Sequence, residues 1–177
     1  IANIHAMKGD VPKMVSAYMD LIGTNPAYLQ SVQNSLTRYM DLGIPYGRSE
    51  ILRTELLRRI QRDPQNIVYP ELLIWMYIQQ NDLNSAFVQS RALDKRLDEG
   101  GTRMMELAAI ALANDDHATA FKCYDYVLAL GRNDANYIRA RIGSVQTRFD
   151  QLTAQHDPAM ADLIDLDQRS ANTLGEL

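Results

Sequence analysis

The sequence predicts an all-α protein made of antiparallel helix pairs. Apolar residues recur at three-and-four spacing along almost the whole chain, which is the spacing of one helix face. No Asn-Gly or Asp-Gly pair joins two alternating runs, as a tight β-hairpin would require. One stretch also reappears in similar form further along the chain. The content of 46% hydrophobic and 23% charged residues in 177 is that of an ordered globular chain.

The first long helix is predicted to follow Asp10, whose carboxylate can accept hydrogen bonds from the free amides of the first turn. Its apolar face consists of Val11, Met14, Val15, Tyr18, Leu21 and Ile22. A second helix is predicted after Asn25, which is a natural cap. Pro26 then takes the first helical position, where the missing N–H of proline has no cost.

Further helices are predicted along the rest of the chain. Their expected ranges are about 49–62, 69–80, 83–98, 103–113 and 117–130. The run DANYIRARIGSVQTRFDQL follows, with an apolar face that we expect neighbouring helices to bury. That face consists of Ile138, Ile142, Val145, Phe149 and Leu152. Asp157 and Pro158 are expected to open a last helix.

The internal repeat relates LIWMYIQQNDLNSAF, residues 73–87, to LAAIALANDDHATAF, residues 107–121. The shared pattern is an apolar residue in the first helix, an acidic residue at the turn, and a small and an aromatic residue in the second helix. The identical pairs are Leu73 and Leu107, Asp82 and Asp116, Ala86 and Ala120, and Phe87 and Phe121. Because the repeat places the acidic stretch ANDDHATAF at a turn between two helices, we interpret it as a turn with a helix cap. It is not interpreted as a catalytic or metal-binding cluster.

A helix-turn-helix unit with the period of this repeat, about 34 residues, resembles the tetratricopeptide repeat (TPR). The clearest copy has Leu107, Ala108, the turn Asp115-Asp116-His117, Ala120, Tyr124 and Val127. The copy before it has Leu73, Tyr77, the turn Asn81-Asp82-Leu83 and Ala86, with Ile74 and Ser90 as departures from the family pattern. Weaker traces are Asp63-Pro64, Gly9-Asp10, Tyr18 and Asn25-Pro26. The resemblance implies a right-handed α-solenoid superhelix, with Phe87, Phe121 and Tyr124 filling the space between its layers.

On this resemblance, residues 1–177 form a single TPR-like domain. Its expected parts are a partial repeat at 1–24, a degenerate repeat at 26–64, repeats at 66–98 and 101–131, and capping helices at 134–174. Pro26 and Pro64 are further apart than one repeat period, so extra residues are expected in the turn at 42–50. Because the first unit is only a second half, we expect the chain to be a fragment of a longer protein.

A second resemblance is carried by the stretches YLQSVQNSL, ELLIWMYIQQNDLNSAF and ALDKRLDEGG. They look like a segment of the large extracytoplasmic repeat proteins of Bacteroidetes. This second resemblance implies an exported, periplasmic or extracytoplasmic parent, and it implies no activity. No apolar run is long enough to cross a membrane, so direct membrane insertion is not expected.

No sequence motif for catalysis, a cofactor or a metal is found: HExxH, GxSxG, the P-loop and the dinucleotide glycine fingerprint are all absent. We therefore expect no enzyme activity, no cofactor and no metal. Cys123 lies on a helix beside core positions and is expected to be a packed thiol. His5 and His156 are too far apart in the chain to suggest a shared site.

The charge of the chain argues against a nucleic-acid partner, because the formal net charge is −4 and phosphate binding needs clustered cations. The most basic helix carries Arg48, Arg53, Arg58, Arg59 and Arg62. Glu55 lies one helical turn before Arg59, so this face is predicted to be solvated and internally paired.

A protein or peptide is the expected partner. In TPR arrays the first helices of successive repeats line the concave face. By resemblance, the exposed positions there are Asn34, Thr37, Asp41, Val68, Glu71, Trp75, Ile78, Gln79, Thr102, Met105, Ala109 and Leu112. Trp75 and Ile78, with Met105 and Leu112, can form an apolar anchor for a peptide or helix. Alternatively, Trp75 packs against an adjacent repeat of the same protein. Thr37 and Asp41 stand where the family's carboxylate clamp has other residues, so capture of chaperone C-termini is not expected.

Three functional hypotheses follow. The first is a non-enzymatic scaffold for protein–protein contacts. The second is a purely structural stretch that packs within a larger solenoid, which an exposed apolar end would favour. The third is an accessory domain of an enzyme whose active site lies elsewhere in the parent protein.

Overall fold

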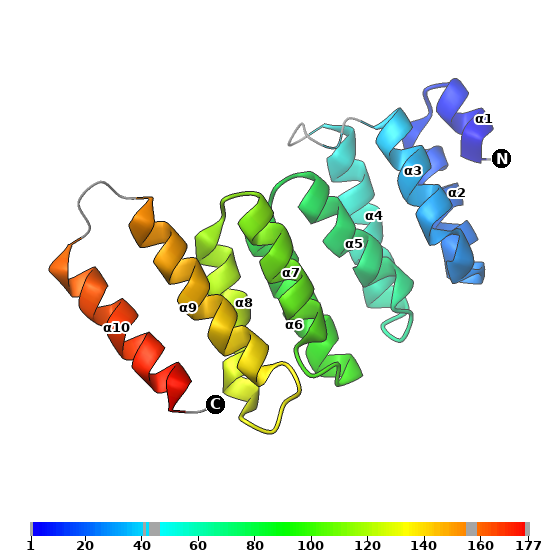
Figure 1. Cartoon of the computed structure of the whole chain (residues 1–177). Coiled ribbons are helices and arrows are strands. Elements are labelled where there is room, and N and C mark those ends of the chain that lie inside the picture. The colour runs from blue at the N-terminus through cyan, green and yellow to red at the C-terminus, as the bar shows by residue number, and fades with distance from the viewer. Residues whose placement is uncertain (1, 41, 43–46, 155–158, 176–177) are drawn as a thin grey trace. The chain divides into compact units, whose positions relative to one another are not determined.

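The computed structural model describes residues 2–40, 42, 47–154 and 159–175, and all regular structure in these residues is helical (Figure 1). The elements are α1 (Ala2–Met7), α2 (Val11–Thr24), the 3₁₀ helix η1 (Pro26–Tyr28), α3 (Leu29–Tyr39), α4 (Arg48–Arg62), α5 (Val68–Gln79), α6 (Leu83–Leu97), α7 (Thr102–Ala113), α8 (His117–Leu130), α9 (Tyr137–Thr153) and α10 (Met160–Leu174). The predicted all-α class is confirmed for these residues.

The predicted helix ranges between 49 and 130 agree with the structure to within a residue or two at each end. Pro26 opens η1 rather than α3, because Asn25 closes a short Asx turn by accepting the Ala27 N–H at 3.1 Å. Part of the turn at 42–50 lies outside the described residues, as do Asp157 and Pro158, and α10 begins at Met160. The repeat boundaries themselves stay a prediction.

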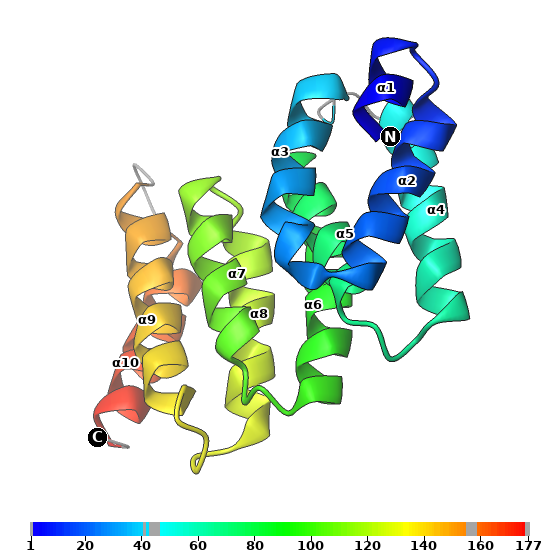
Figure 2. The same cartoon turned by 90° about the vertical axis from the view of Figure 1, so that its right-hand side faces the viewer.

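The chain divides into two compact units, residues 1–89 and 90–177, and the division falls within α6. In the first unit α2 is the central element, since it contacts α1, η1, α3, α4 and α5 (Figure 2). The most deeply buried side chains of this unit are Met14, Met19, Ile22, Leu36, Leu52, Leu56, Leu72, Leu73, Met76 and Leu83. They come from every long helix of the unit, so one apolar core joins them.

Helix α5 is enclosed on most of its circumference by α2, α3 and α4. Its buried residues are Val68, Tyr69, Pro70, Leu72, Leu73, Ile74, Met76 and Tyr77. A helix that is apolar nearly all round belongs in an interior, which is where this sequence places it. The phenol of Tyr69 donates a hydrogen bond to the Met19 carbonyl at 3.4 Å and so joins α5 to α2.

In the second unit α7, α8, α9 and α10 lie side by side, each antiparallel to the next (Figure 1). The interior is lined largely by small side chains, which let the helices approach closely. Residues that are 0% exposed there are Met104, Ala108, Ala111, Ala120, Cys123, Val127 and Ala140. Phe121 departs from expectation: its ring is only half-buried, and the Arg169 guanidinium lies 5.8 Å from the ring centroid. Tyr124 is buried, as predicted.

Three turns between paired helices share one geometry. In each, a residue with left-handed φ ends the first helix. These residues are Gly9 (φ 72°), Asn81 (φ 55°) and Asp115 (φ 57°). The next residue donates its N–H to the carbonyl five positions earlier, as in a Schellman motif. These bonds measure 3.0 Å from Asp10 to His5, 2.9 Å from Asp82 to Tyr77 and 2.9 Å from Asp116 to Ala111.

The aspartate of each turn also caps the second helix. Its Oδ1 accepts a hydrogen bond from the backbone N–H three residues later, which satisfies one of the free amides of the first turn. The distances are 3.3 Å for Asp10 and Lys13, 3.0 Å for Asp82 and Ser85, and 2.9 Å for Asp116 and Thr119. The predicted capping roles of Asp10 and Asp116 are confirmed.

The close approach of α8 and α9 depends on Gly143. A Cβ added there would lie 2.8 Å from Cζ and 2.9 Å from Cε1 of Tyr124. Alanine is a better helix former than glycine by about 1 kcal/mol, yet we expect Gly143→Ala to lower the free energy of unfolding by about 1–3 kcal/mol through overpacking. Chemical denaturation measures this change.

Gly175→Ala is the matched control, because the nearest atom to its added Cβ is the Ala171 carbonyl oxygen at 3.5 Å. That substitution is expected to change the free energy of unfolding by less than about 0.5 kcal/mol. A Gly143→Ala protein as stable as the unmodified chain would contradict the packing described for α8 and α9.

Candidate functional site

The predicted partner-binding residues of α3 lie at the surface. Asn34 and Thr37 are exposed, and both already make hydrogen bonds within their own helix. Asn34 accepts from the Gln30 amide at 3.1 Å, and the Thr37 hydroxyl donates to the Gln33 carbonyl at 3.0 Å. Asp41 lies outside the described residues.

On α5 the prediction needs a correction. Val68 is only 1% exposed and belongs to the core, because the start of α5 is enclosed by its neighbours. Gln79 is exposed, whereas Glu71, Trp75 and Ile78 are half-buried. Trp75 and Ile78 are three residues apart and therefore share a helix face. The part of Trp75 that reaches solvent fits both interpretations of this residue, and its role as an anchor stays a prediction.

On α7, Thr102 and Ala109 are exposed, and Met105 and Leu112 are half-buried. Met105, Ala109 and Leu112 are spaced by four and then three residues, so they share one face of α7. Thr102 is engaged, since its hydroxyl accepts a hydrogen bond from the Asn136 amide at 3.2 Å. Because α5 and α7 belong to different compact units, their predicted residues are two separate candidate surfaces.

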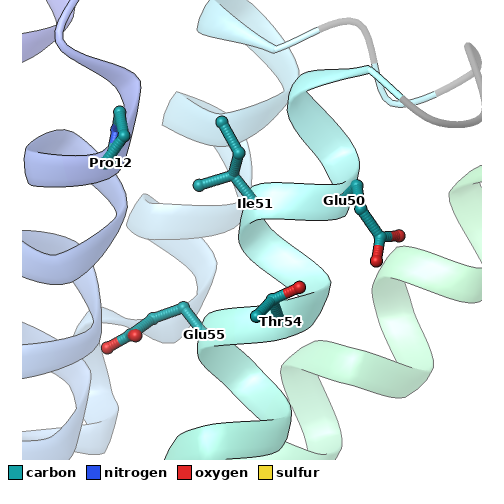
Figure 3. Close-up of a pocket in the computed structure, with 5 residues that line it drawn as sticks. All are labelled: Pro12, Glu50, Ile51, Thr54 and Glu55. Atoms are coloured by element: carbon teal, nitrogen blue, oxygen red, sulfur yellow. The ribbon is translucent and has the colours of Figure 1, made fainter.

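A groove of about 320 Å³ runs between α2 and α4 in the first unit and is lined by Pro12, Glu50, Ile51, Thr54 and Glu55 (Figure 3). Two carboxylates in one groove raise the question of acid–base catalysis. Figure 3 shows Glu50 and Glu55 pointing to opposite sides of α4, so they do not converge on one point.

Arginine holds both of these glutamates as ions. Arg53 donates to the two oxygens of Glu50 at 2.8 and 2.6 Å, and Arg58 does the same for Glu55. These hydrogen bonds hold the pKa of each carboxyl below its ordinary value. A carboxyl that stays ionised at neutral pH is not a general acid, and its arginine partner occupies it as a base.

The basic helix α4 is internally paired, as predicted. Arg59 donates from Nε to Glu55 at 2.7 Å, and its Nη1 lies 2.7 Å from the Asp20 carboxylate on α2. Arg59 thus joins two helices, and Arg53 and Arg58 are held by Glu50 and Glu55. Much of the positive charge of α4 is used in contacts within the first unit.

Cys123 is 0% exposed, and burial raises the pKa of its thiol to about 12. A thiol that is neutral and enclosed is a packing residue rather than a nucleophile. No group of three His, Cys, Asp or Glu side chains is placed to hold a metal ion in the described part of the chain, and His156 lies outside that part.

The predicted burial of the apolar face of α9 is confirmed for Leu152 and wrong for Ile138, Ile142 and Phe149. Ile142 and Phe149 are each 49% exposed and Ile138 is 36% exposed. The side of α9 that is buried consists of Tyr137, Ala140, Ser144, Thr147 and Leu152. Small residues and Gly143 let α9 approach α8 on that side, so Ile138, Ile142 and Phe149 are left facing outward.

Helix α10 also exposes large apolar side chains, namely Met160, Leu163, Ile164 and Leu174. Polar contacts bind α10 to α9: Arg148 pairs with Asp162 and, at 3.3 Å, with Asp165, and Arg169 donates to Ser144 at 3.3 Å. We call Ile138, Ile142, Phe149, Met160, Leu163, Ile164 and Leu174 the α9–α10 surface. In the described residues, the other exposed large apolar side chains are dispersed over α1, α2, η1, α4, α6, α8 and the loop before α5.

Within the described residues, none of the helices combines the length and the apolar character that crossing a membrane requires. Comparison of the chain with known protein families, with curated proteins and with solved structures gives no match. The TPR resemblance and the separate resemblance to repeat proteins of Bacteroidetes therefore remain predictions.

Because Cys123 is enclosed, we expect its thiol to react with an aromatic disulfide reagent at least about a hundredfold more slowly in the native chain than in denaturant. Absorbance of the released thiolate follows the reaction at mildly alkaline pH. Equal rates in the two states would mean that α8 does not bury this side chain.

Proposed function

We propose that this chain is a non-enzymatic scaffold of TPR type that works through protein–protein contacts. We further propose that another helical layer packs on the α9–α10 surface. The observation that carries the proposal is the outward-facing apolar side chains of the last two helices, led by Ile142 and Phe149 at 49% exposure.

Repeated turn geometry supports the repeat architecture. The turns at Asn81-Asp82 and Asp115-Asp116 lie one repeat period apart and have the same left-handed φ, the same return hydrogen bond and the same aspartate cap. A chain that contains the same helix-turn-helix unit twice is typical of an architecture in which helix pairs stack on one another.

Stacked helix pairs also explain what the α9–α10 surface lacks. A terminal pair needs a polar outer face to remain soluble, whereas this pair exposes aliphatic and aromatic side chains. Burying one such side chain is worth about 1.5–3 kcal/mol, so covering several of them is strongly favourable. Leucine, isoleucine and phenylalanine at helical spacing are suited to contact with another amphipathic helix.

The same observation also favours the second hypothesis, in which the covering layer belongs to the parent protein itself. Both versions require contact between helical layers and no chemistry. The paired glutamates of the α2–α4 groove and the enclosed Cys123 offer no support to an enzyme in the described residues.

If the α9–α10 surface is adhesive, the purified chain should self-associate weakly with rising concentration. We expect Ile142→Gln/Phe149→Gln to weaken that association at least about tenfold, because two exposed apolar side chains are removed. Sedimentation velocity measures the association, and thermal unfolding shows that the fold is kept.

The matched control is Ile51→Gln/Val88→Gln, which removes two exposed apolar side chains (36% and 46% exposed) from other helices. This control should associate as the unmodified chain does. An unmodified chain that stays monomeric, or an Ile142/Phe149 variant that associates as strongly, would contradict the role given to this surface.

The predicted anchor on α5 is tested separately. We expect Trp75→Ala/Ile78→Ala to lose partners that the unmodified chain retains in a pull-down, because aromatic and aliphatic anchors carry much of the binding energy of an interface. Gln79→Ala, on an exposed position of the same helix, is the control. A folded double variant that keeps every partner would exclude Trp75 and Ile78 as an anchor.

A further inference from the structure

Helix α10 contacts α9 with one face and exposes the opposite one (Figure 1). The exposed residues recur at the three-and-four spacing of a helix seam. We call them the outer face of α10, and they are Met160, Leu163, Ile164, Asp167, Ala171 and Leu174. This face is apolar apart from Asp167, so it presents a single negative charge within an apolar seam.

Asp167 differs from the other charged residues of α10 in having no partner. Asp162, Asp165 and Arg169 all make polar contacts with α9. Asp167 forms no hydrogen bond or ion pair among the described residues. Its carboxylate therefore plays no part in holding α10 against α9.

The position of Asp167 on the outer face determines what a covering helix must do. Ile164 and Ala171 lie about one helical turn away on either side, and Met160 and Leu174 lie about two turns away. A helix that covers these apolar side chains also removes the central carboxylate from water. That removal is costly unless the covering helix brings an opposite charge to the same level.

Helix pairs within this chain already show such compensation. Asp20 on α2 pairs with Arg59 from α4 at 2.7 Å, and Asp165 on α10 pairs with Arg148 from α9 at 3.3 Å. In both cases the neighbouring helix supplies a guanidinium to an aspartate on the helix it packs against. The outer face of α10 has the aspartate, and the cation has to come from the helix that covers it.

A second copy of the chain does not supply that cation. A two-fold contact places the same patch of both copies face to face. Because Asp167 lies at the centre of the outer face, two copies of α10 that overlap fully, in either direction, bring the two Asp167 carboxylates together. Like charges across an interface are unfavourable, so we expect Asp167 to keep self-association through this face weak.

We propose that the outer face of α10 binds an amphipathic helix of a partner that carries a lysine or arginine among its apolar residues, paired with Asp167. The apolar side chains supply most of the adhesion, and Asp167 selects a basic helix over a second copy of the chain. A single polar residue in an apolar seam can fix register and partner in this way. The assignment rests on the role proposed for the α9–α10 surface and adds the chemistry of the occupant.

Self-association tests the selection against a second copy. We expect Asp167→Asn, which removes the charge and keeps the shape, to strengthen self-association of the full chain at least about tenfold in sedimentation velocity. The matched control is Asp125→Asn, the same change at an exposed residue of α8, and it should associate as the unmodified chain does. Thermal unfolding shows that each variant keeps the fold.

The partner's chemistry is tested with two synthetic amphipathic helical peptides. One has leucine along its apolar face and an arginine at the centre of that face, and the other has glutamate in place of the arginine. We expect the arginine peptide to bind the full chain at least about tenfold more tightly in fluorescence anisotropy, with a smaller difference at high salt. Asp167→Lys should reverse the preference.

A further variant separates this proposal from the role of the surface itself. Ile164→Gln/Leu174→Gln removes apolar side chains from the outer face and keeps Asp167, so it should weaken binding of both peptides. If it does so while the two peptides bind the unmodified chain equally, the apolar surface stands and the basic partner is excluded.

Three other results would overturn the proposal. A preference for the arginine peptide that Asp167→Lys leaves unchanged would show that Asp167 does not set it. Unchanged self-association in Asp167→Asn would mean that the charge does not disfavour a second copy. If neither peptide binds, the outer face does not receive a helix, and the role proposed for the α9–α10 surface loses its support at α10 as well.

Discussion

An apolar helix face has to be covered by a neighbouring helix, and this constraint determines most of the structure. Helices of this length are marginal alone in water and gain their stability from packing. Helix α5 satisfies the constraint over most of its circumference, because α2, α3 and α4 cover it there. The short turns serve the same end, since a left-handed residue and an aspartate cap reverse the chain within a few residues and place the second helix against the first. At α9 and α10 the constraint is not met, because large apolar side chains of both helices are exposed to solvent.

Charged residues orient the helices in this structure more than they stabilise them. Arg59 connects α4 to Asp20 on α2, and Arg148 connects α9 to Asp162 on α10. Partly exposed pairs of this kind contribute about 0–1 kcal/mol each, so they select a register but do not replace apolar burial. That distinction matters for α10, which Arg148 and Arg169 join to α9 by polar contacts and which exposes four large apolar side chains.

Periodicity in the sequence predicted the helices and the aspartate-capped turns, because both depend on residues close together in the chain. It did not predict which face of a helix its neighbours cover. On α9 the spacing of Ile138, Ile142 and Phe149 shows that they share a face, yet the small residues opposite them pack against α8. The prediction for Val68 is wrong for a related reason. Its position in the repeat suggested an exposed residue, whereas the helices around α5 bury it. Such outcomes depend on side chains from other helices, which spacing within one helix does not report.

Sequence spacing is equally limited for polar residues, as the pocket lined by Asp94, Asp98 and Asp134 in the second unit shows. Asp94 looks like an ordinary charged residue near the end of a helix, and nothing in its immediate sequence indicates that Gly101, Tyr126 and Asp134 surround it. Residues near the C-terminal ends of α6 and α8 line this one pocket, namely Asp94 and Lys95 from α6 and Tyr126 and Leu130 from α8. Loop aspartates of the pocket then add to the partial charges of both helix ends. An acidic pocket can therefore arise from two helix ends and a few acidic loop residues that meet only in the folded chain, without any motif that a linear search would detect.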